Sequence, residues 1–103
     1  MRKKSTRINL SVNQADKQLL EHLTSYYSTS TQRIIEAALA QMMLVERPQE
    51  NIPQPYTKDH LVPLRADGLM STQLATLITK TGMTQQDILR IALQRFGKAF
   101  DSA

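Results

Sequence analysis

The chain has 103 residues and a formal net charge of +4, with 41% apolar and 21% charged residues. This composition is typical of an ordinary folded domain, and so short a chain cannot enclose a large catalytic cavity. It holds no cysteine, which excludes disulfides, thiolate metal sites and zinc fingers.

Positive charge collects at the start of the chain, in Arg2, Lys3, Lys4 and Arg7. A basic cluster favours an anionic partner, although it is also typical of a solvated tail. An alternating pattern follows this cluster in place of an apolar stretch, so we expect neither a signal peptide nor a membrane span. The resulting expectation is a cytoplasmic protein.

The first predicted element is a strand at residues 7–12, where polar and apolar residues alternate. This period is that of a strand with one buried face. The inward positions are Ile8, Leu10 and Val12, and the outward positions are Arg7, Asn9 and Ser11.

Two helices are predicted after this strand. Asn13 can cap the first helix, and Asp16 in its first turn suits the helix dipole. This helix is expected to end near residues 26–28, where Tyr26 and Tyr27 pack at its end, and Ser30 or Thr31 can cap the second one. Arg47 and Pro48 are expected to end the second helix. Each helix carries an apolar stripe: Leu19, Leu20 and Leu23 in the first, and Ile34, Ile35, Ala38, Leu39 and Met42 in the second.

Residues 46–59 contain three prolines and indicate an extended linker. The same order of elements is then predicted again, with Asp67 as the cap of a third helix, Gly82 as its break and Thr84 as the cap of a fourth. Arg90, Arg95 and Lys98 are expected to suit the C-terminal end of that last helix. The inward residues are Val62, Leu64 and Ala66 in the strand, Leu74, Leu77 and Ile78 in the third helix, and Ile88, Leu89, Ala92, Leu93 and Phe96 in the fourth.

The two halves match at a spacing of 54 residues without a gap. Between residues 10 and 39, seven residues recur at this spacing and six of them are apolar, as expected of two copies of one core, although shared helical periodicity can account for part of the match. The recurring residues are Leu10, Leu20, Leu23, Gln32, Ile34, Ala38 and Leu39. The predicted domains are a first repeat with its basic arm at 1–45, the linker at 46–59, a second repeat at 60–98 and a tail at 99–103.

One strand and two short helices bury too little surface to be stable alone, and they expose an unpaired strand edge. Duplication supplies a partner within the chain. The predicted fold is therefore mostly α with a two-stranded antiparallel β-ribbon, in which four helices cover one ribbon face and leave the other bare.

The first half resembles the ribbon-helix-helix family, to which the Arc and methionine repressors belong. The resemblance rests on the alternating strand 7–12, the Asn13 cap, the Leu20 and Leu23 helix, and the capped helix at 30–39. The second half is a weaker match, and two copies in one chain resemble the tandem members found among conjugation accessory proteins.

This resemblance implies that the ribbon enters the major groove of double-stranded DNA. The implied base-reading residues are Arg7, Asn9 and Ser11, with Arg65 from the second strand. Arginine can pair with guanine and asparagine with adenine, which agrees with this role, although an ordinary solvent-exposed strand face gives the same pattern. The implied phosphate-binding residues are Arg2, Lys3, Lys4, Ser30, Thr31, Thr84 and Gln85, the last four at helix N-termini, where Ser30 and Thr84 can equally serve only as caps.

The second strand departs from the family pattern because Leu61 and Pro63 stand where Arg7 and Asn9 stand in the first. Two arrangements stay open. Either the two strands pair within one chain and read an asymmetric site, or the first repeats of two chains pair while the second repeats hold the assembly together. The first arrangement is slightly favoured.

The expected role is a small transcriptional repressor or a plasmid or conjugation accessory regulator, associated with the nucleoid or a plasmid. Alternatives are an antitoxin whose C-terminal half binds a toxin, and a partition protein that coats DNA repeats. Expected partners are double-stranded DNA and further copies of the chain, with a toxin or a relaxosome protein as alternatives. His22 and His60 lie in no catalytic or metal-binding motif, so no enzyme, metal or cofactor is expected.

Overall fold

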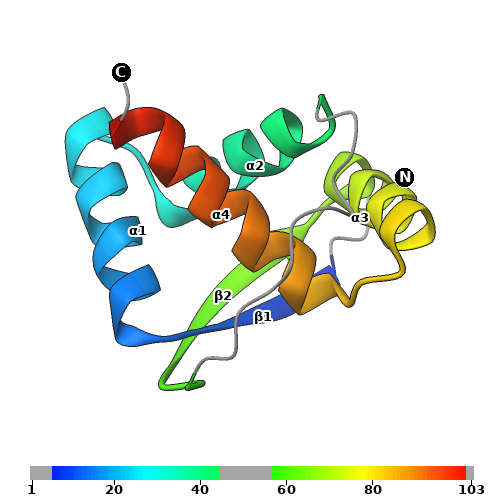
Figure 1. The fold of residues 1–103 in the computed structure, drawn as a ribbon, viewed down its shortest axis with the longest axis horizontal. Coiled ribbons are helices and arrows are strands. Elements are labelled where there is room, and N and C mark those ends of the chain that lie inside the picture. The colour runs from blue at the N-terminus through cyan, green and yellow to red at the C-terminus, as the bar shows by residue number, and fades with distance from the viewer. Residues whose placement is uncertain (1–5, 45–56, 102–103) are drawn as a thin grey trace.

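The computed structural model describes residues 6–44 and 57–101. These described residues form two strands and four helices, and the same order of one strand and two helices occurs twice (Figure 1). The elements are β1 (Thr6–Val12), α1 (Gln14–Tyr27), α2 (Thr31–Met42), β2 (His60–Ala66), α3 (Gly68–Thr81) and α4 (Gln85–Asp101). Each element of the second half begins 54 positions after its counterpart in the first, as the sequence spacing predicted.

The two strands pair with each other as an antiparallel ribbon within one chain. The register runs from Thr6 opposite Ala66 to Val12 opposite His60, with Asn9 opposite Pro63 at its centre. Because Asn9 and Pro63 occupy equivalent positions in the two halves, the approximate two-fold axis passes between them. The predicted intramolecular ribbon is thus the arrangement that this structure has.

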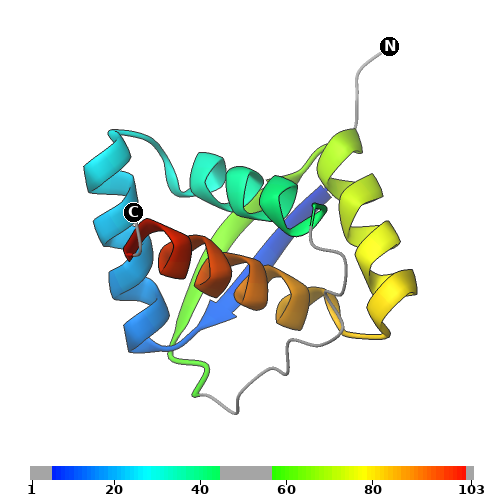
Figure 2. The same ribbon diagram turned by 45° about the horizontal axis from the view of Figure 1, so that its top comes forward.

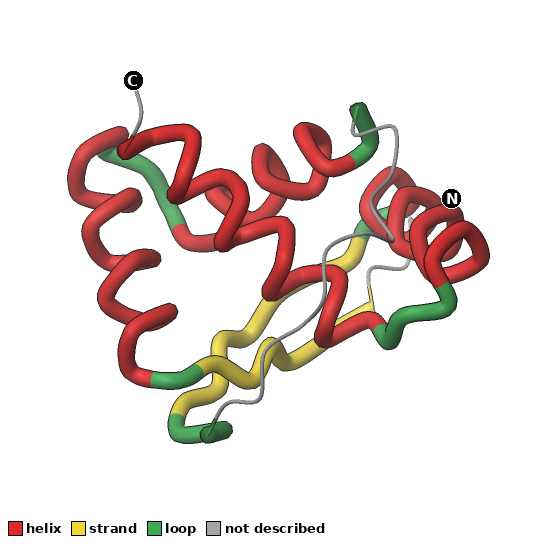
Figure 3. The backbone as a smooth tube through the Cα atoms, viewed as in Figure 1, coloured by secondary structure: helices red, strands yellow, loops and turns green. Residues whose placement is uncertain are grey.

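All four helices lie on one side of the ribbon (Figure 1). After a turn of the view, α2 and α4 cross over the ribbon side by side, with α1 and α3 at opposite flanks (Figure 2). Short loops join helix to helix in each half (Figure 3). No helix among the described residues has the length and apolar character needed to cross a membrane.

Each helix begins at the residue that the sequence predicted as its cap. Asn13 Oδ1 accepts from the Asp16 amide at 2.8 Å, and Asp67 Oδ1 accepts from the Met70 amide at 2.8 Å. Ser30 Oγ accepts from Arg33, and Thr84 Oγ1 accepts from Asp87, both at 3.2 Å. These bonds satisfy amides that have no partner inside a helix, which fixes where each helix starts.

The first helix of each half ends in a left-handed residue, Ser28 in α1 (φ 52°) and Gly82 in α3 (φ 74°). This conformation turns the chain sharply, so the second helix of each half packs back over the ribbon. The predicted breaks near Ser28 and at Gly82 are therefore confirmed.

Buried apolar side chains from both halves form one core between the ribbon and the helices. The ribbon contributes Leu10, Val12, Leu64 and Ala66, and the helices contribute Leu20, Leu23, Ile34, Ile35, Ala38, Leu39, Met42, Met70, Leu74, Leu77, Ile88, Leu89, Ile91, Ala92 and Leu93. Ile8, Leu19, Val62 and Phe96 are partly buried at its margin. The two halves therefore share a single hydrophobic interior.

The structure differs from the sequence predictions at the edges of some elements. Ile78 is 36% exposed, and the buried stripe of α3 runs through Met70 instead, at the four- and three-residue spacing of Met70, Leu74 and Leu77. Tyr26 is largely exposed, although its ring contacts that of Tyr27 edge-to-face with 5.0 Å between the centroids. The second helix ends at Met42, ahead of Arg47 and Pro48, which lie outside the described residues, and α4 continues to Asp101 through part of the predicted tail.

Candidate nucleic-acid interface

None of the described helices covers the outward face of the ribbon (Figure 1), and the strand side chains alternate between this face and the core. In β1, Arg7 and Asn9 are exposed and Ser11 is half-buried. In β2, Leu61, Pro63 and Arg65 are all exposed. These are the outward positions that the sequence predicted, and the strand pairing brings all six onto one surface.

The register sets these outward residues opposite one another in pairs. Arg7 lies opposite Arg65 at one end of the ribbon. Ser11 lies opposite Leu61 at the other end, and Asn9 lies opposite Pro63 in the middle. The four residues predicted to read bases are therefore on one face, but both arginines are at the same end.

Glutamine side chains from the first turns of α2 and α4 hold the two edges of the ribbon. Gln32 Nε2 donates to the Arg65 carbonyl at 2.8 Å, and Gln32 Oε1 accepts from the Arg65 amide at 3.0 Å. In the other half, Gln86 Oε1 accepts from the Ser11 amide at 2.8 Å, and Gln86 Nε2 donates to the Asn9 carbonyl. The helices thus satisfy strand-edge groups that would otherwise need water or another strand.

The bonding of these two glutamines to the ribbon edges was not predicted from the sequence. Gln32 and Gln86 are the one polar identity between residues 10–39 and 64–93, and this identity was the available signal. Their bonds also explain how Pro63 is tolerated. Arg65, two positions along, directs its amide and carbonyl to α2 and away from β1, and alternate residues of an antiparallel strand face the same way. The Pro63 nitrogen therefore faces the free edge, where no donor is needed for the ladder.

The helix N-termini predicted to bind phosphate lie beside the ribbon, one near each end, because Gln32 and Gln86 bond to it. The hydroxyls of Ser30 and Thr84 serve as caps. Thr31 and Gln85 are half-buried at the same helix starts. The remaining predicted phosphate ligands, Arg2, Lys3 and Lys4, lie outside the described residues.

No family model matches this chain, and neither a curated protein nor a solved structure is found to be similar to it.

A buried ion pair lies behind the interface, between α1 and α4. Arg90 Nε contacts Asp16 Oδ2 at 2.7 Å, and both side chains are under one-tenth exposed. Gln94 Nε2 donates to the other Asp16 oxygen at 3.4 Å. Asp16 lies in the first turn of α1, as the sequence predicted. Arg90 lies near the start of α4 and not towards its C-terminal end, so its expected role at that end is wrong, and it contacts Asp16 across 74 positions instead.

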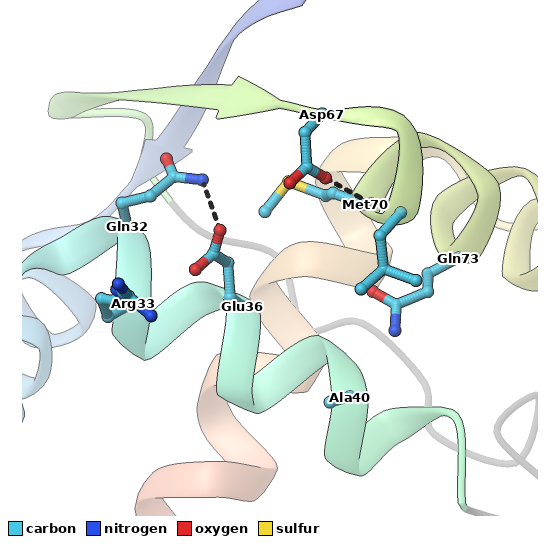
Figure 4. Close-up of a pocket in the computed structure, with 8 residues that line it drawn as sticks. Gln32, Arg33, Glu36, Ala40, Asp67, Met70 and Gln73 are labelled. Carbon is cyan, nitrogen blue, oxygen red and sulfur yellow. Dashed lines mark hydrogen bonds between the residues drawn. The ribbon is translucent and has the colours of Figure 1, made fainter. Parts of the chain in front are cut away.

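The equivalent place in the other half is an open pocket of about 480 Å³ between α2 and α3 (Figure 4). Glu36 and Met70 line it and stand where Arg90 and Asp16 stand in the closed half. Glu36 accepts a 3.3 Å hydrogen bond from Gln32, whose side chain also holds the ribbon edge. The two halves are thus alike in backbone and different in the polar contacts beneath the ribbon.

The described residues contain no group of three or more histidine or acidic side chains that could hold a metal ion. His60 contacts Gln14, with 2.7 Å between Nε2 and Oε1, at the junction of β2 and α1. This contact joins the two halves and brings no nucleophile to the histidine.

Proposed function

We propose that this chain is a single-chain, tandem ribbon-helix-helix protein that binds double-stranded DNA through the outward face of its β1–β2 ribbon. The observation that carries the proposal is a two-stranded ribbon whose described helices all lie on one face, while the other face presents the exposed Arg7, Asn9 and Arg65. Arginine and asparagine side chains carry the donors and acceptors that read guanine and adenine edges.

The dimensions of the ribbon suit the major groove. Two paired strands lie about 4.8 Å apart, and a groove about 12 Å wide admits such a ribbon with its side chains. The N-termini of α2 and α4 flank the ribbon, and the positive ends of their helix dipoles favour phosphate. A net charge of +4 favours the same partner.

The shared core favours this function over that of an antitoxin. A C-terminal segment that folds on a toxin would not need to complete the core of the first half. In this structure Leu64, Leu77 and Leu93 of the second half are buried in the core that both halves share. Repression, conjugation accessory function and partition all use the same DNA contact, and the proposal covers the contact that they share.

The test measures binding to duplexes that the protein selects from a random-sequence pool, at several salt concentrations. We expect Arg7→Ala and Arg65→Ala each to weaken binding by about 10- to 100-fold, because each removes a guanine-reading group. Arg95→Ala, the same substitution at an exposed position of α4, is the matched control and should bind nearly as the parent does. Unchanged binding and salt dependence in both ribbon variants would contradict the proposal.

A further inference from the structure

The two ends of the ribbon's outward face carry different side chains. If the two halves were alike, position 61 would repeat Arg7 and position 65 would repeat Ser11, with one arginine at each end. Instead Arg7 and Arg65 lie directly opposite each other, and Leu61, 67% exposed, lies opposite Ser11. Like charges directly opposite one another destabilise a strand pair. An electron-rich partner at the arginine end would reduce this repulsion.

The helix starts beside the two ends of the ribbon also differ in charge. The bonds of Gln32 to Arg65 place the start of α2 at the arginine end, and those of Gln86 to Ser11 place the start of α4 at the leucine end. The first turn of α2 presents the exposed Arg33, whereas the equivalent residue of α4 is Asp87. A phosphate at the first site meets a cation, and one at the second meets a carboxylate.

The two ends suit different base edges. Paired arginines match the O6 and N7 acceptors of guanine, and an exposed leucine matches the methyl group of thymine. Leu61 lies four positions before Arg65 along β2. At about 3.3 Å per residue this is about 13 Å, which corresponds to about four base pairs.

We infer that the target is a non-palindromic duplex, with guanine at the Arg7 and Arg65 end and thymine about four base pairs away at the Leu61 end. The protein therefore binds it in one orientation. This inference rests on the proposed function. Phosphate contacts concentrate on the guanine half, on the side of α2.

The test is selection from random-sequence duplexes by the parent protein and by Leu61→Arg, which restores the arginine of the other half. We expect the parent to enrich an asymmetric sequence and Leu61→Arg to enrich guanine at both ends. Leu44→Arg is the matched control: it is the same substitution at a leucine 84% exposed just beyond the C-terminal end of α2. It should leave the selected sequence unchanged.

A second measurement isolates the thymine contact. Replacing thymine by uracil at the selected position should weaken binding of the parent about fourfold, the effect of one buried methyl-sized group. The same replacement should weaken binding of Leu61→Ala less, because its side chain is shorter. A palindromic selected sequence, or no loss with uracil, overturns this inference while DNA binding stands. Failure of the parent to enrich any sequence, together with binding independent of salt, overturns the proposed function itself.

Discussion

Asp16 and Arg90 form a contact that distinguishes two halves with the same order of elements. At the equivalent positions the other half holds Met70 and Glu36, so the contact exists once. Burying both charges is costly, and the short contact with the added bond from Gln94 offsets that cost. The pair therefore joins α1 to α4 on one side of the core only.

Removing one member of this pair leaves the other charge buried without this ion-pair contact. We expect Asp16→Met and Arg90→Met each to lower the free energy of unfolding by about 3–5 kcal/mol, measured by denaturant titration. The double variant should recover much of this loss, because an apolar pair of similar size needs no desolvation of charge. A loss below about 1 kcal/mol in both single variants, as for a surface ion pair, would contradict this account.

At the scale of the elements, most boundaries follow from local chemistry and were predictable. Caps at Asn13, Ser30, Asp67 and Thr84 and the alternation of the strands depend on neighbouring residues, which the sequence displays directly. The ends of α2 and α4 were less well predicted. Helix ends depend on how much surface each last turn can bury, and that is a property of the folded molecule.

The two glycines at the ends of α3 lie in open space yet should respond oppositely to the same substitution. Gly82 has a left-handed backbone, so Gly82→Ala should lower the free energy of unfolding by about 1 kcal/mol. Gly68 lies in the first helical turn without a positive φ, so Gly68→Ala should raise it by about 0.5–1 kcal/mol. Thermal unfolding of the two variants measures both signs, and a shared sign would refute the role given to Gly82.

The candidate interface was predictable in composition and not in arrangement. Arg7, Asn9, Ser11 and Arg65 follow from alternation within each strand. Their pairing depends on a register set by contacts between residues far apart in sequence, such as Gln32 with Arg65 and Gln86 with Ser11. A shift of register by two residues would keep every side chain on its face and still change which residues lie opposite one another.

At the scale of the whole molecule, the halves fold as one unit because they share the ribbon and the core. Each strand finds its partner in the same chain, and the buried cluster draws on both halves. Separate melting of the halves would expose the core of each, so we expect a single cooperative transition.

This arrangement also predicts how stability depends on protein concentration. A ribbon formed between two chains would unfold at a temperature that rises with concentration, whereas one formed within a chain would not. We expect the midpoint of thermal unfolding to stay constant over a hundredfold range of concentration. A midpoint that rises steadily with concentration would show that the folded unit contains more than one chain.

The covalent link between β1 and β2 has a consequence for dosage. When a DNA-reading ribbon must first assemble from two dilute chains, occupancy of a site varies with the square of the protein concentration. For the DNA binder proposed here each newly made chain already carries a finished ribbon, so occupancy varies with the first power. The response to synthesis or dilution, as at cell division, is then graded rather than switch-like.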